Sequence, residues 1–155
     1  MTELKSPIQV SLAESSSIDF IIQSQIQMAR ETERMELDIA TVTKGVNAVF
    51  SNPSIGNYFI ASKDGKQIAC LLTLPEWSDW RNGKVLWIHS VFVLPEYRKL
   101  GVYSCMYAHL KKMVSESSEY RGLRLYVDKS NGGAQKVYEK LGMNKDHYEL
   151  YEWMK

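Results

Sequence analysis

Residues 91–104 read Val-Phe-Val-Leu-Pro-Glu-Tyr-Arg-Lys-Leu-Gly-Val-Tyr-Ser, and this stretch decides the fold. An apolar, β-branched run ends at Pro95, a basic turn containing Gly101 follows, and a helical pattern begins at once. A helix that starts directly after a strand and a glycine turn presents several main-chain N–H groups in one direction. With the positive end of the helix dipole, these groups make a site for phosphate or diphosphate. Arg98 and Lys99 should add mobile positive charge, so we predict that a phosphorylated cofactor binds here.

The composition of the chain limits its class. Its 155 residues are enough for one domain with a substantial core. The 19 Lys and Arg residues nearly balance the 18 Asp and Glu residues, which argues against a nucleic-acid partner. No long apolar stretch indicates a membrane span, and the N-terminus lacks the pattern of a secretion signal. Cys70 and Cys105 lie in apolar surroundings, so we expect buried thiols in one cytoplasmic domain over residues 1–155.

Apolar periodicity predicts an α/β domain with a mixed sheet and helices on both faces. Asp64–Gly65 and Asn82–Gly83 predict tight hairpins, Pro75 should end its strand, and Ser17 should cap the first helix. The element order is β-α-α-β-β-β-α-β-α-β. Strands are expected at 8–11, 58–61, 68–74, 85–93, 123–127 and 147–153, and helices at 17–29, 39–50, 102–114 and 134–141.

Three features together resemble the GNAT superfamily of N-acetyltransferases. They are the element order, the pattern Val-x-Val-x-Pro-x-Tyr-Arg-x-x-Gly over 91–101, and the run Asn131…Ala134…Tyr138-Glu-Lys-Leu-Gly142. The resemblance implies a mostly antiparallel central sheet, with acetyl-CoA as the cosubstrate. The acceptor would be a small-molecule or peptide amine, and family members are often homodimers. No His or Cys pattern in the sequence suggests a metal.

By this resemblance, the strand and the turn would hold the cofactor. The main chain of Val91–Val93 would pair with the pantetheine arm, and an N–H there would polarise the thioester carbonyl. The family's turn usually ends on a small residue, whereas Tyr103 stands there in this chain and could crowd the diphosphate. The residues so assigned to the cofactor are Val91, Phe92, Val93, Arg98, Lys99, Leu100, Gly101, Val102, Tyr103, Ser104, Asn131 and Tyr138.

Tyr138 is the candidate general acid. The resemblance implies that it protonates the departing coenzyme A thiolate, which a phenol with a pKa of about 10 can do when it is held close. Tyr138 follows Asn131 by seven residues, about two helical turns, so both side chains can address one groove. The alternative is an ordinary core stripe of Ala134, Tyr138 and Leu141, with Asn131 acting only as the helix cap.

A general base is harder to identify, although an amine must lose a proton before it attacks. His89 is the candidate, since its ordinary pKa of about 6.5 suits proton relay. Period-two alternation would place His89 on one strand face with Val91 and Val93. The alternative is a core histidine with satisfied hydrogen bonds, and Asp128 is the fallback base.

The acceptor side gives the weakest signal. In the implied fold, the turn after the first helix and the loop before the central strand wall the acceptor site. Glu31 and Glu33 in the turn, Trp77 in the loop and nearby His89 would suit a cationic amine, but a solvated acidic loop explains the same residues. Two functions therefore stay open: an N-acetyltransferase, and a catalytically inactive member of the fold that binds acyl-CoA as a sensor or interaction protein.

Overall fold

The computed structural model describes residues 6–155, which fall into two compact units, one up to Leu125 and one from Tyr126 to Lys155. A single domain over the whole chain therefore stays a prediction. Within the described residues, no helix combines the length and the apolar character that crossing a membrane requires.

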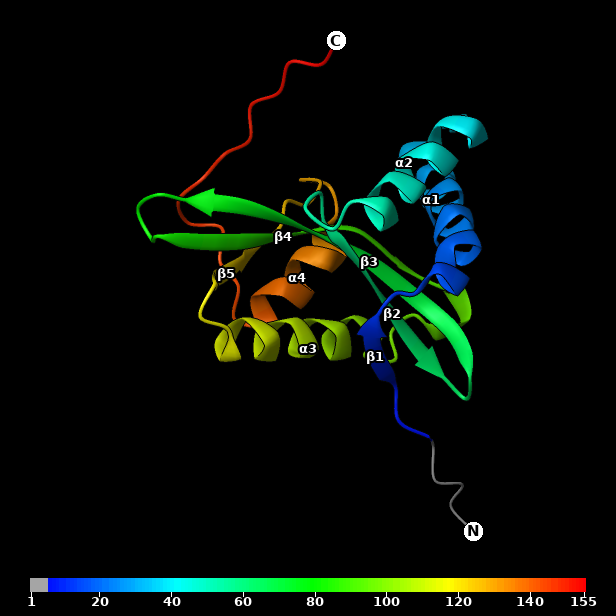
Figure 1. Ribbon diagram of the computed structural model, residues 1–155, viewed down its shortest axis with the longest axis horizontal. Coiled ribbons are helices and arrows are strands. Elements are labelled where there is room, and N and C mark those ends of the chain that lie inside the picture. The colour runs from blue at the N-terminus through cyan, green and yellow to red at the C-terminus, as the bar shows by residue number, and fades with distance from the viewer. Residues whose placement is uncertain (1–5) are drawn as a thin grey trace. The chain divides into compact units, whose positions relative to one another are not determined.

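A five-stranded sheet runs through the first unit (Figure 1). Each of β1, β2 and β3 pairs antiparallel with the strand that follows it, and β5 runs parallel to β4. The mixed, mostly antiparallel sheet expected from the sequence is thereby confirmed. In spatial order the strands are β1 (Gln9–Leu12), β2 (Asn57–Lys63), β3 (Lys66–Ser78), β4 (Gly83–Val93) and β5 (Tyr120–Arg124).

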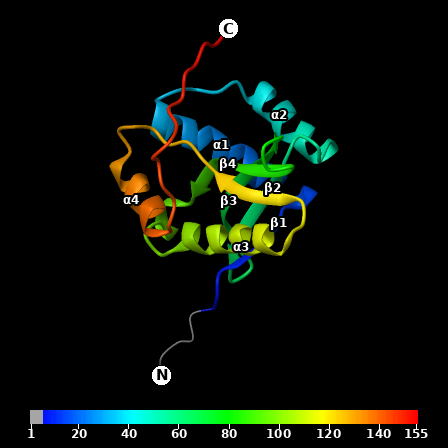
Figure 2. The same cartoon turned by 90° about the vertical axis from the view of Figure 1, so that its left-hand side faces the viewer.

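Helices cover both faces of this sheet, as Figure 2 shows. On one face lie α1 (Ile18–Glu33) and α2 (Ile39–Ser51), and on the other lies α3 (Val102–Glu116). The α1 and α2 side buries a cluster that includes Ile26, Cys70 and Phe92. Met106 and Leu110 of α3 are completely buried. The apolar stripes read from the sequence therefore pack the sheet into a layered core.

Strand β3 continues past Pro75, which was expected to end it. Pro75 lies opposite Leu86 of β4, and the ladder runs on to Ser78. Proline lacks the N–H that a central strand needs, but β2 stops pairing with β3 at Thr73. Beyond Thr73 that side of β3 is an edge, so the missing donor costs little.

Strand β5 also differs from the prediction, since it spans Tyr120–Arg124 rather than 123–127. The guanidinium of Arg121 donates to the carbonyl oxygens of Arg81 at 3.0 Å and Asn82 at 2.8 Å. These bonds tie the start of β5 to the β3–β4 hairpin. Polar residues before the predicted strand thus belong to the strand and anchor it.

The second unit contains α4 (Gly132–Lys140). The main-chain N–H of Ala134 donates to Asn131 Oδ1 at 3.1 Å, so Asn131 caps this helix as expected. After Gly142, at φ 87°, residues 147–153 form no strand in the described chain, so that expectation was wrong. An alternation of apolar and polar residues is a property of the segment itself, whereas a strand also needs a neighbouring strand to which its main chain can hydrogen-bond.

Two local expectations were wrong. Ser17 precedes α1, but its hydroxyl does not cap the helix and instead accepts from Gln67 Nε2 at 2.9 Å. Ser17 closes a short 3-10 turn (Ser15–Ser17) and has a helical backbone, which does not suit a side-chain cap. Cys70 is buried, but Cys105 is exposed, because Val102 and Met106 take the core-facing positions of α3.

Candidate functional site

Strand β4 changes character at Ser90. Leu72 of β3 lies opposite His89, while Cys70 lies opposite Phe92. The two positions are therefore two residues apart on β3 and three apart on β4. Ser90 adopts the left-handed conformation at φ 52°. One extra residue with this backbone is a β-bulge, which bends and twists the strand.

The bulge lies where β4 leaves β5. The last parallel pair joins Trp87 to Arg124, and none follows it. Within the described residues, no strand pairs with 90–93 on that side, and we name this segment of β4 the open edge. Main-chain N–H and C=O groups are obligatory hydrogen-bonding groups, so an extended ligand can pair with them as an added strand would.

The extra residue changes the face on which His89 lies. His89 and Phe92 lie opposite Leu72 and Cys70, which share one face of β3. That face packs under α1 and α2, because Phe92 and Cys70 belong to the same buried cluster. Val93 lies opposite Ala69, on the other face. The expectation that His89 shares a face with Val93 was therefore wrong, since it assumed unbroken alternation.

His89 is half-buried beside Trp87, with 6.2 Å between the ring centroids. Burial lowers the pKa of His89 below its ordinary value, because a charged imidazolium loses hydration there. His89 is therefore mostly neutral near pH 7. A neutral imidazole is the form that can accept a proton.

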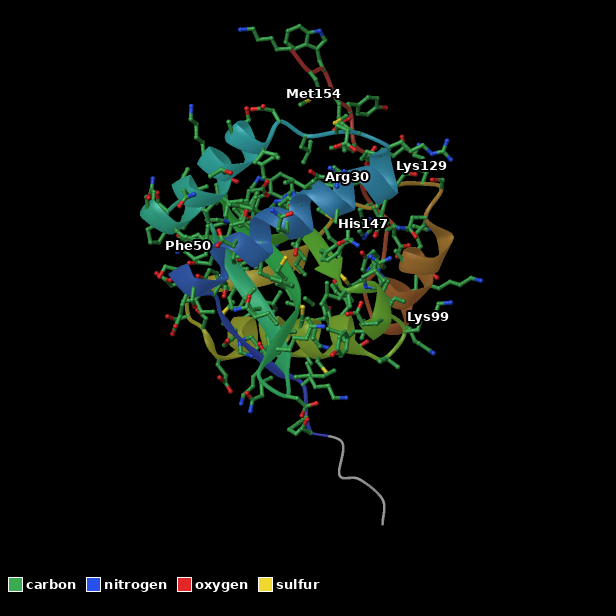
Figure 3. The ribbon with its side chains drawn as sticks, turned by 90° about the vertical axis from the view of Figure 1, so that its right-hand side faces the viewer. Arg30, Phe50, Lys99, Lys129, His147 and Met154 are labelled. Atoms are coloured by element: carbon green, nitrogen blue, oxygen red, sulfur yellow. The ribbon has the colours of Figure 1, made fainter. Side chains whose placement is uncertain are left out.

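The turn after β4 leads straight into α3. A short 3-10 helix (Pro95–Tyr97) precedes it, and Lys99 and Gly101 take left-handed conformations at φ 61° and 78°. Helix α3 starts at Val102 without a side-chain cap. Its first N–H groups are thus not taken by a side chain, and Lys99, labelled in Figure 3, is exposed nearby. This arrangement fits a diphosphate.

Arg98 does not supply the mobile charge that we expected. Its Nε donates to the carbonyl oxygen of Val93 at 2.9 Å, and its Nη2 donates to Glu31 Oε2 at 2.7 Å. The guanidinium carbon also lies 5.6 Å from the centroid of the Phe92 ring. Arg98 is therefore held against β4 and α1.

Tyr103, at the position where the family usually has a small residue, is half-buried on α3. Its ring lies 6.3 Å from that of Tyr107, one helical turn later. The two rings form an (i, i+4) pair along the helix. Tyr103 is therefore part of the α3 surface next to the turn.

The candidate acid and two other predicted groups belong to the second unit. Tyr138 is half-buried in α4, and burial raises the pKa of its hydroxyl, so it keeps its proton at neutral pH. Asp128 accepts from the hydroxyl and the main-chain N–H of Ser130, which keeps its pKa below the usual range. A carboxylate held in this way is a weak base.

The predicted acceptor residues do not form one group. Glu31 binds Arg98, whereas Glu33 is exposed at the last position of α1. Trp77 lies opposite Lys84, six residues before Ser90, which is about 20 Å along an extended strand. Trp77 therefore lies far along the hairpin from the bulge.

Two side chains near His89 were missed by the sequence reading. Trp87 lies beside His89, and Arg124 lies opposite Trp87 on β5. The Nη1 atom of Arg124 lies 2.8 Å from Glu76 Oε1. The two-residue spacing of Trp87 and His89 could have indicated from the sequence that they share a strand face, but no sequence signal pointed to Arg124. Residues 6–155 hold no group of three or more His, Cys, Asp or Glu side chains placed to bind a metal.

Comparison with known proteins places these features in context. The model of the acetyltransferase (GNAT) family matches residues 19–143. The crystal structure of a possible acetyltransferase from Clostridium difficile 630 is 37% identical, with a TM-score of 0.88, covering 95% of this chain and 97% of that chain. No curated protein matches the sequence significantly.

Two more distant structures contain coenzyme A compounds. One is a predicted acetyltransferase with acetyl-CoA from Clostridium acetobutylicum, 18% identical, with a TM-score of 0.72 over 94% of this chain and 96% of that chain. The other is AAC(6')-Iy in complex with the bisubstrate analogue CoA-S-monomethyl-acetylneamine, 16% identical, with a TM-score of 0.75 over 97% and 99%. At these identities the likeness shows the fold alone.

Proposed function

The chain belongs to the acetyltransferase (GNAT) family, and on that premise we propose that it transfers the acetyl group of acetyl-CoA directly to a primary amine. The observation that carries the proposal is the open edge of β4 next to the uncapped start of α3, within one unit. An open strand edge suits an extended arm with amide groups, and a helix start suits a diphosphate. Both parts occur in acetyl-CoA, which the C. acetobutylicum structure contains.

The residues that would hold the cosubstrate follow from this fit. The main chain of Val91–Val93 would bind the arm, and the N–H groups of 99–104 would bind the diphosphate, with Lys99 adding charge. Asn131 and Tyr138 of α4 are further contacts that we propose on the family pattern. When bound, acetyl-CoA supplies a thioester carbonyl that is open to attack.

The chain's own groups would then promote the transfer. A main-chain N–H of the open edge would stabilise negative charge on the carbonyl oxygen. Neutral His89 would accept a proton from the amine, and protonated Tyr138 would give one to the departing thiolate. Direct attack is proposed because burial raises the pKa of Cys70 to about 11, so this thiol is a poor nucleophile.

The experiment is coenzyme A release with a panel of amines. We expect turnover with at least one amine, and Tyr138→Phe should lower kcat by about 100-fold while binding of coenzyme A stays nearly intact. Tyr151→Phe is the matched control, because it makes the same change at a side chain that is 90% exposed. An unchanged kcat in Tyr138→Phe would remove this residue from the acid role.

The pH profile tests the proposed base. Because the pKa of His89 is lowered, kcat/KM should decrease on acidification with a midpoint below the ordinary histidine pKa of about 6.5. His89→Gln should remove that decrease and slow the reaction. A decrease that persists in His89→Gln would assign it to another group.

An inactive acyl-CoA sensor is the second candidate function. Asp128 favours this second candidate, because hydrogen bonds from Ser130 lower the pKa of its carboxylate and make it a poor general base. A sensor would gain thermal stability from acetyl-CoA and release no coenzyme A with any amine of the panel.

A further inference from the structure

The side chain of Arg98 joins two elements that are far apart in the sequence. Through Nε it binds the carbonyl oxygen of Val93, at the end of the open edge. Through Nη2 it binds Glu31, which is 67 residues away on α1. Its guanidinium also lies over the ring of Phe92, which is only 3% exposed. Arg98 therefore contacts β4 and α1 through two hydrogen bonds and through the flat face of its guanidinium, although its side chain is 42% exposed.

The partner of Arg98 on α1 is itself held in place. Glu31 Oε1 accepts from Gln27 Nε2 at 2.8 Å, one helical turn earlier, while Oε2 accepts from Arg98. The bonds from Gln27 and Arg98 keep the pKa of Glu31 below its usual range, so the carboxylate stays ionised. Both oxygens have partners, which fixes the carboxylate on the surface of α1.

The turn that follows Arg98 needs such support. Lys99 has a left-handed backbone, which L-residues other than glycine rarely adopt and which persists only where the surroundings enforce it. Lys99, Leu100 and Gly101 are all exposed, so their own side chains provide little packing. The turn is therefore held at its two ends, by buried Val102 on one side and by Arg98 on the other.

The segment before the turn has its own attachment. Lys66 Nζ lies 3.2 Å from Glu96 Oε1 and 5.3 Å from the centroid of the Tyr97 ring. This contact fixes the 3-10 turn to the β2–β3 hairpin. It stops short of Lys99, so it cannot replace Arg98 as the last support before the left-handed residues.

We propose that Arg98 is a positioning residue, which holds the turn in its anion-binding shape by tying β4 to Glu31, and that it is not a ligand of the diphosphate. The inference rests on the proposed function, and it changes the role that the family resemblance gave to this residue. Nε and Nη2 of the guanidinium are bound to Val93 and Glu31, so these contacts direct it toward β4 and α1 and limit its freedom to follow a phosphate. Lys99 is exposed and makes no ion pair within the described residues, so its charge is the one available to the diphosphate.

Glu31→Gln separates the two roles, because it keeps the Arg98 guanidinium but removes the charge that holds it. For a positioning residue, the turn loosens, and the Kd for coenzyme A in calorimetry should rise about threefold, which is typical of losing a half-exposed ion pair. For a ligand, release from Glu31 would leave the affinity unchanged or improve it. Arg98→Gln should raise the Kd by about tenfold, and Arg98→Lys should restore only part of the loss, because lysine lacks the planar fork.

The second measurement needs no cosubstrate. Backbone ¹⁵N order parameters of residues 99–101 in the free protein should be about 0.85 in the wild type and should fall toward about 0.6 in Glu31→Gln and Arg98→Gln. Glu36→Gln is the matched control, because it removes the exposed ion pair between Glu36, just after α1, and Arg30 of α1, at 2.8 Å. Arg30 is labelled in Figure 3. This control variant should leave residues 99–101 rigid.

The outcomes distinguish this inference from the proposed function. Unchanged order parameters in both Glu31→Gln and Arg98→Gln, or tighter coenzyme A binding in Glu31→Gln, would overturn the positioning role. A loosened turn together with no coenzyme A binding by the wild type would support the positioning role and overturn the proposed function instead.

Discussion

Two helices of the first unit begin in opposite ways. Helix α2 follows Asp38, whose Oδ2 accepts from the main-chain N–H of Thr41 at 2.9 Å. Helix α3 follows Gly101, which has no side chain to offer. Both starts carry the same partial positive charge. The chain neutralises one with its own carboxylate and leaves the other beside Lys99. Helix α1 also lacks a side-chain cap but has Asp19 in its first turn, whereas α3 has neither a cap nor an acid there. A helix start without either group, rather than a helix start as such, therefore distinguishes the proposed anion site.

The largest expected effect comes from giving α3 the carboxylate that α2 already has. Ser104→Glu places an acid in the first turn of α3, where it would compete with the diphosphate. We expect the affinity for coenzyme A to fall by about 100-fold with no loss of thermal stability, because acids are favourable in a first helical turn. Calorimetry and thermal unfolding measure the two effects.

The neutral control for that change is Ser104→Gln, which has nearly the same size. It should weaken binding far less than Ser104→Glu. Equal losses in the two variants would show that bulk, and not charge, matters at this helix start.

The second effect concerns the glycine that replaces a cap. Gly101→Ala should lower the free energy of unfolding by about 1–2 kcal/mol, because its φ of 78° is strained for alanine although the new methyl group would meet no atom within 4 Å. Gly45→Ala, in α2, also meets nothing within 4 Å but has no positive φ. It should raise the free energy of unfolding by about 0.5–1 kcal/mol. Denaturant titration measures both, and effects of the same sign would contradict the role given to Gly101.

The smallest effect is expected at the capped helix. Hydrogen bonds from Thr41 keep the pKa of Asp38 below its usual range in the folded protein. The stabilisation that ionised Asp38 gives to the folded protein is therefore fully present above the pKa of Asp in the unfolded chain, about 3.9. It is lost as the pH falls through the lower pKa of Asp38 in the folded protein. Asp38→Ala should lower the Tm at neutral pH but not in strong acid, and it should leave the coenzyme A affinity unchanged. A weaker affinity would mean that the two helix starts are not independent.

The turn between β4 and α3 was predictable because its determinants are local. Pro95, Gly101 and the helical pattern after them lie within one short stretch, and the structure places the turn and helix there. The bulge was not predictable, because Ser90 carries no sign of its positive φ. That single residue reverses the alternation, which is why His89 lies on the other face from Val93.

Long-range pairs account for the remaining differences. The role of Arg98 depends on Glu31, 67 residues away, and no local pattern links the two. The continuation of β3 past Pro75 depends on where β2 stops pairing, which is also a non-local fact. Sequence periodicity therefore located most of the elements, although not a strand at 147–153, while the partners of the candidate site residues could be seen only in the folded chain.

The most direct test of the account is a titration of ¹⁵N-labelled protein with coenzyme A, followed through the main-chain amide signals. If the diphosphate binds the main-chain amides of α3, large shifts are expected for residues 101–104 at the start of α3, and essentially none for residues 39–42 at the start of α2. Large shifts elsewhere with residues 101–104 unmoved would show that the diphosphate does not bind the main-chain amides of α3.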